Sequence, residues 1–155
     1  MKISSRCRYA ALALFDIAFH NDGRPTQVKQ IAQRQKIPGR FLEQIFQDLR
    51  RAELVDGKRG RNGGYFLHRS PSDISLLDVI HATGGVIDLG HGPTAGSPSM
   101  PMSTPIESSD ILVQAWADVG RKISDIYAEI SLADLVERAE RAGLSRTNPG
   151  YMYFI

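Results

Sequence analysis

Cysteine is almost absent from this chain of 155 residues, which contains only Cys7. A single thiol excludes a disulfide within the chain and every zinc site built from several cysteines. No apolar run approaches the roughly 20 residues of a membrane-spanning helix. The apolar stretch near the N-terminus is interrupted by Asp16 and has no small-residue cleavage site after it, so we interpret it as a helix rather than a signal peptide. We therefore expect a cytoplasmic protein with no membrane partner.

Each half of the chain is poor in charge of one sign. Residues 1–70 carry 14 Lys and Arg against 6 Asp and Glu, a net charge of +8, whereas residues 71–155 carry 5 against 11, a net charge of −6. The apolar share of 42% is sufficient for a packed core. A basic first half favours a polyanionic partner, and the acidic half indicates a separate task. The alternative is an uneven scatter of charge without functional meaning.

Apolar residues at helical spacing predict three helices before residue 52. The first covers 6–19, with Ser4 or Ser5 as its N-cap, and the second opens after Pro25 with Thr26 as its N-cap. The segment 36–39 (KIPG) ends the second helix. The third helix is expected to bury one continuous stripe, formed by Phe41, Leu42, Ile45, Phe46 and Leu49.

A hairpin and a fourth helix complete the first half. Leu54-Val55 and Tyr65-Phe66-Leu67 read as paired strands, and the loop between them, GKRGRNGG, is too long and glycine-rich for a tight turn. Ser75 is placed to cap a helix over 76–82. We take residues 1–83 as one domain on this pattern.

The second half is organised differently. Residues 84–106 are rich in Gly, Pro and Ser and predict a flexible loop, followed by a long helix and a further helix within 107–142 and a C-terminal tail over 143–155. The long helix carries apolar residues in steps of four and three, which is a heptad seam. Since the preceding elements already close a core, we expect this seam to be a dimer contact formed by Leu112, Trp116, Val119, Ile123, Ile126 and Ile130.

Two helices, a tight turn and a following hairpin are the order of a winged helix-turn-helix, so the fold class is mainly α with a small β-hairpin wing and a long dimerisation helix. The outer side of the third helix carries side chains that hydrogen-bond base edges or phosphates. The hairpin loop adds cations, and its glycines let the backbone approach phosphates closely. The predicted DNA-binding residues are Arg40, Glu43, Gln44, Gln47, Arg51, Lys58, Arg59, Gly60 and Arg61. For Glu43 the alternative role is an ion pair with Lys36, Arg40 or Arg50.

These features predict a dimeric, sequence-specific DNA-binding transcriptional regulator whose partners are double-stranded DNA and a second copy of the chain. An alternative is a redox-sensing or protein–protein adaptor whose winged fold no longer binds DNA, although an adaptor has no need for a basic hairpin. No nucleophile–base pair, metal spacing or cofactor loop is visible, so we do not expect an enzyme.

Three segments together resemble the Rrf2 family of bacterial transcription regulators, which includes the IscR, NsrR, RirA and CymR types. They read MKISSRCRYAALALFDIA, VKQIAQRQKIPGRFLEQIFQDLRRAELV and KRGRNGGYFL. The resemblance covers residues 1–83 closely and 107–142 by pattern. It implies a homodimer whose long helices cross to the partner, with Arg40, Glu43 and Gln44 facing bases and Arg59 with Gly60 entering the minor groove.

The chain departs from this family in the sensor region. Iron–sulfur members of the family carry three cysteines in the loop before the long helix, but residues 84–110 contain none. The usual cluster therefore cannot be built, and we expect no cofactor. Cys7 lies near a helix start between Arg6 and Arg8, which would favour its thiolate. It is interpreted as a packing residue, with a redox-active thiol, or an unconventional iron–sulfur cluster that adds His91 or a carboxylate, as alternatives. The signal would be redox state, iron or sulfur supply, or a metabolite.

Overall fold

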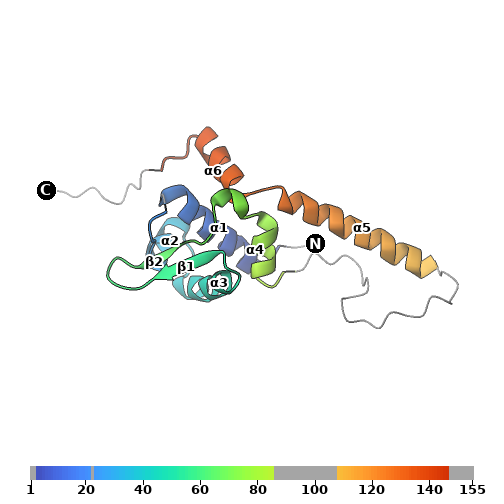
Figure 1. Ribbon diagram of the computed structural model, residues 1–155, viewed down its shortest axis with the longest axis horizontal. Coiled ribbons are helices and arrows are strands. Elements are labelled where there is room, and N and C mark those ends of the chain that lie inside the picture. The colour runs from blue at the N-terminus through green and yellow to red at the C-terminus, as the bar shows by residue number, and fades with distance from the viewer. Residues whose placement is uncertain (1–2, 22, 86–107, 147–155) are drawn as a thin grey trace.

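The computed structural model, which describes residues 3–21, 23–85 and 108–146, is mainly helical, with a two-stranded hairpin whose loop projects from the edge of the helical body (Figure 1). The described helices are α1 (Ser5–His20), α2 (Val28–Gln35), α3 (Gly39–Arg51), α4 (Leu76–Ala82), α5 (Ser108–Ala128) and α6 (Leu132–Arg141), with a short 3₁₀ turn η1 (Pro71–Asp73) before α4. The antiparallel strands are β1 (Val55–Lys58) and β2 (Gly64–Leu67). This arrangement confirms the predicted fold class.

Serine side chains cap three of the described helices, α1, α4 and α6, and the first two of these caps agree with the sequence prediction. The Ser4 hydroxyl accepts a hydrogen bond from the backbone of Cys7 at 3.1 Å and caps α1. Ser75 caps α4 in a reciprocal pairing with the carboxylate of Asp78, and α6 begins with the same kind of capping box. The prediction for α2 is wrong by one residue, because Gln27 and not Thr26 occupies its N-cap. Thr26 is buried and pairs with the hairpin instead.

The core lies between α1, α3, α4 and the hairpin. Leu14, Phe46 and Leu49 are fully buried there, together with Val79 of α4. One member of the predicted α3 stripe is an exception, since Phe41 is 60% exposed and lies outside the core. Its position at the edge of the stripe turns it toward the start of α1, where its ring meets Tyr9 with 6.4 Å between the centroids.

Helix α5 extends away from this core, while α6 folds back onto α1 (Figure 1). The joint between them is held by two backbone hydrogen bonds of 2.9 Å, from Leu76 to the carbonyl of Ile130 and from Leu132 to that of Ile74. These bonds hold the C-terminal end of α5 in place, whereas most of the described surface of this helix is exposed. Its large exposed apolar residues are Ile111, Leu112, Trp116, Val119 and Ile126.

Candidate nucleic-acid interface

The turn between α2 and α3 sets the direction of α3. Lys36 adopts a left-handed backbone conformation with φ of 53°, and the next residue, Ile37, is buried and donates its backbone N–H to Ala32 at 3.1 Å. Pro38 then takes the N-cap of α3, where its missing N–H costs no helical hydrogen bond. A tight turn thus joins the two helices, and the buried side chain of Ile37 holds this turn in place.

The outer side of α3 carries the predicted base-reading residues Arg40, Glu43, Gln44 and Gln47. All four are exposed, and within the described residues none of these side chains forms a hydrogen bond or an ion pair. The alternative role of Glu43, an ion pair with a neighbouring cation, is therefore not found in this part of the chain. A row of unpaired donors and acceptors on one helix is chemically suited to base edges in a major groove.

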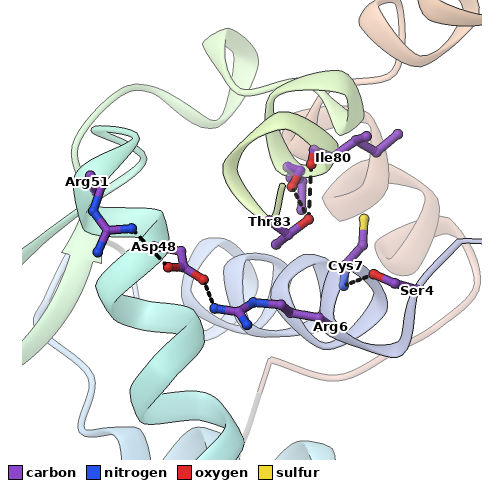
Figure 2. A network of polar contacts seen from close by, with 8 residues as sticks. Ser4, Arg6, Cys7, Asp48, Arg51, Ile80 and Thr83 are labelled. Carbon is purple, nitrogen blue, oxygen red and sulfur yellow. Dashed lines mark hydrogen bonds and ion pairs between the residues drawn. The ribbon is translucent and has the colours of Figure 1, made fainter. Parts of the chain in front are cut away.

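The fifth predicted contact on this helix, Arg51, differs from the others because it has an acidic partner. Asp48 lies between Arg51, at 3.2 Å, and Arg6 of α1 (Figure 2). Most of the Arg51 side chain stays exposed, at 77%. Asp48 thus partly neutralises the positive charge at this end of α3.

The hairpin forms the wing, and its register runs from Val55 opposite Leu67 to Lys58 opposite Gly64. The cations Lys58, Arg59 and Arg61 are exposed on the strand end and loop. Gly60 adopts φ of 110°, and a Cβ added at Gly63 would lie 2.2 Å from the carbonyl oxygen of Lys58. Glycine is therefore required at both positions for the backbone to follow this tight path. The cations of the loop stand at the other positions.

The wing is attached to the helix-turn-helix at two places. Thr26 and Tyr65 exchange backbone hydrogen bonds of 2.8 Å in both directions. The Tyr65 ring also stacks on Phe46 of α3, with 4.4 Å between the centroids and 19° between the planes. Because both contacts are close and largely buried, the cationic loop and the polar side of α3 form one structural unit.

A buried ion pair connects α1 with α2. The carboxylate of Asp16 is fully buried and accepts hydrogen bonds from Nε of Arg34 at 3.0 and 3.1 Å and from Gln35 at 2.8 Å. In the sequence, the only indication of this pair is the interruption of an apolar run by Asp16. Its role is to position α2, the first helix of the helix-turn-helix.

Cys7 is buried at the start of α1, and its side chain faces Thr83 at the end of α4 (Figure 2). Burial raises the pKa of the Cys7 thiol, and a hydrogen bond with Thr83 only partly offsets this effect. The direction expected for the thiol from its arginine neighbours is therefore wrong, because burial raises its pKa. Packing, the first interpretation of Cys7, agrees with this environment.

The residues present do not fit an iron–sulfur cluster held by several thiolates. The chain has one cysteine, and the described residues include no group of three or more His, Cys, Asp or Glu that could hold a metal ion. His91, the other candidate ligand, lies outside the described residues, as does nearly all of the predicted loop 84–106. The proposed domain limits at these positions stay predictions.

An amphipathic helix-turn-helix with a cationic wing on the same rigid unit defines a winged helix-turn-helix DNA-binding protein. The comparisons with known proteins agree. The family model described as Rrf2, iron-dependent transcriptional regulator, matches residues 3–138. The chain belongs to the Rrf2 family of DNA-binding transcription regulators, and it is not an enzyme. No helix in the described ranges is both long and apolar enough to cross a membrane.

Relatives support this assignment over most of the chain. The HTH-type transcriptional regulator IscR of Vibrio campbellii is 33% identical over 144 residues, which cover 90% of this chain and 80% of the relative. Among solved structures, IscR of T. potens is 31% identical with a TM-score of 0.70 and covers 99% of this chain and 97% of that one. CymR, the global cysteine regulator of B. subtilis, is 27% identical with a TM-score of 0.70, covering 89% and 98%.

Proposed function

We propose that the chain acts as a homodimer that binds a pseudo-palindromic operator, with α3 in the major groove and Arg59 of the wing in the adjacent minor groove. The observation that carries this proposal is the unpaired polar row of α3 beside the exposed cations of the wing. Bidentate pairs with bases and arginine in a narrow minor groove are the contacts that such side chains make with DNA.

The homodimer is proposed from the surface of α5. Leu112, Trp116 and Val119 of the predicted seam are 58%, 48% and 40% exposed. Exposure of such an apolar row to water is unfavourable. Packing against α5 of a second copy of the chain would bury it. Two recognition helices related by a two-fold axis would then read two matching half-sites.

We propose that this protein senses its signal without the family's three-cysteine cluster. The single thiol of the chain is buried, and burial opposes its ionisation. An iron–sulfur cluster through Cys7 and His91 would require ligands from elsewhere. We therefore propose no resident cofactor for this chain, and its site of action is the cytoplasm, where its DNA partner lies.

Fluorescence anisotropy with fragmented bacterial genomic DNA tests the DNA-binding part directly. We expect saturable binding at low salt and a linear fall of log affinity with log salt, with a slope of roughly −0.9 for each phosphate that is neutralised. The variant with Lys58, Arg59 and Arg61 changed to Ala should lose most of this slope, whereas a variant of Arg141, an exposed cation of α6, should keep it. Flat titrations of the wild-type chain at low salt would overturn the proposal.

A further inference from the structure

The apolar ring of Phe41 is exposed beside the polar row of α3. Its relative exposure of 60% is far above that of its neighbours Leu42 and Ile45, which are 0% and 1% exposed. A phenylalanine in the first turn of a helix could be buried by a small rotation of the helix, but the Leu42, Ile45 and Leu49 contacts fix α3 in its present orientation. The exposed ring therefore lies beside the base-reading row without being part of the core.

The ring forms one wall of a groove between α3 and the start of α1. This groove has a volume of about 720 Å³, and its lining includes Tyr9, Arg40, Phe41 and Gln44. Two of these residues, Arg40 and Gln44, belong to the unpaired polar row. Because Phe41 and Gln44 are three residues apart on α3 and line the same groove, base pairs placed against Gln44 would lie near Phe41.

The chemistry of the major groove offers one apolar feature to such a ring. Thymine carries a methyl group at C5, which lies toward its own sugar–phosphate strand at the edge of the groove. Apolar side chains, phenylalanine included, contact this methyl group. Phe41 lies on the side of α3 that faces the start of α1. A side chain at the side of a helix in the major groove would lie near one edge of the groove, where a thymine methyl group is found.

We propose that Phe41 is a specificity-determining residue that reads the 5-methyl group of a thymine next to the base pair contacted by Gln44. This inference rests on the proposed function, because it requires α3 to enter a major groove. The Tyr9 ring, with its centroid 6.4 Å from that of Phe41, supports the Phe41 side chain from the α1 side. The row of polar residues selects hydrogen-bonding edges, and Phe41 adds a selection for a methyl group.

The test removes the methyl group without changing any hydrogen bond. The full-length chain is used to select bound duplexes from a random-sequence DNA pool, and each thymine of the selected duplex is replaced in turn by deoxyuridine. At one thymine in each half-site we expect deoxyuridine to weaken binding of the wild type three- to fivefold, the size expected from about 0.8 kcal/mol for one apolar carbon. The Phe41→Ala variant should bind the thymine and deoxyuridine duplexes equally.

Two further variants keep this test decisive. Phe41→Leu retains an apolar side chain and should keep part of the discrimination, even if the Ala variant loses stability. Leu144→Ala, which removes an apolar side chain that is 52% exposed beyond α6, should discriminate like the wild type. Equal binding of every deoxyuridine duplex by the wild type, or an undiminished effect in Phe41→Ala, would overturn the inference while leaving the proposed function standing. A pool that never converges would overturn both.

Discussion

Thr26 and Tyr65 each donate a backbone hydrogen bond to the other's carbonyl oxygen at 2.8 Å. This pair joins the segment before α2 to the first residues of β2. Since the Tyr65 ring also stacks on Phe46, the wing is held at a defined angle to α3. In the proposed docking, α3 and the wing enter neighbouring grooves together, and this backbone pair fixes their relative position.

Gly64→Ala should separate the wing from the helix-turn-helix. A Cβ at this position would lie 2.3 Å from the carbonyl oxygen of Thr26, and φ of 153° is unfavourable for alanine. We expect the free energy of unfolding to fall by about 2 kcal/mol, together with weaker DNA binding. Urea denaturation measures the first effect and anisotropy the second. Gly57→Ala is the matched control, because its Cβ would make only ordinary contacts with Tyr65. Equal losses in both variants would show that this close approach has no special role.

Gln44→Ala should change specificity more than general affinity. Gln44 is exposed, has no partner within the described residues and lies at the centre of the proposed base-reading surface. We expect a loss of roughly 1–3 kcal/mol at one base pair and relaxed preference there, measured by titration of single-base-pair variants of a selected duplex. Lys58→Ala should weaken all sequences about equally, and Gln114→Ala on α5 should change neither property. Unaltered affinity and preference in Gln44→Ala would show that α3 docks differently.

Asp16→Ala should destabilise the helix-turn-helix strongly. Asp16 is fully buried and Arg34 is only 14% exposed, so removal of the carboxylate leaves a largely buried guanidinium without its partner. We expect a loss of about 3–5 kcal/mol in the free energy of unfolding, measured by thermal or urea denaturation. Asp118→Ala breaks the exposed pair with Arg121 on α5 and should have almost no effect. A small loss in Asp16→Ala would mean that water reaches Arg34 easily.

Leu112→Glu should weaken the proposed dimer. Leu112 belongs to the heptad seam, whereas the adjacent Ile111 does not, although both are similarly exposed at 58% and 63%. A buried glutamate on the seam should raise the dimer dissociation constant about tenfold or more, and sedimentation velocity over a concentration series measures it. Ile111→Glu should dissociate like the wild type. A larger rise of the dissociation constant in Ile111→Glu than in Leu112→Glu would place the contact on another side of α5.

Cys7 should react slowly with alkylating reagents. Because burial raises the pKa of its thiol, the thiolate fraction at a given pH is smaller in the folded chain than in the unfolded one. The alkylation rate by iodoacetamide, followed by mass spectrometry, should therefore be lower in buffer than in urea and rise toward alkaline pH. The same shift means that the folded state keeps its proton above the unfolded thiol's pKa, so stability falls as pH rises through that range. A fast reaction at neutral pH in the folded chain would restore Cys7 as a redox candidate.

The helices, the wing and their order could be predicted from the amino-acid sequence alone. Periodicity, caps such as Ser4 and Ser75, and the glycines of the hairpin loop act between residues only a few positions apart, so they are visible without a structure. The polar row on α3 and the cations of the wing follow from the same local patterns. The departure from the family's cysteine pattern was equally readable, since it depends on composition alone.

Features that depend on partners distant in the chain became visible only in the folded structure. Thr26 reads as a helix cap but pairs with Tyr65, Phe41 reads as core but faces outward, and Arg51 proves to share Asp48 with Arg6. The flanking arginines of Cys7 suggested an ionised thiol, yet packing against α4 buries it and raises its pKa. For Thr26, Arg51 and Cys7 the deciding contact is with a residue remote in the chain, and such contacts cannot be read from local sequence patterns.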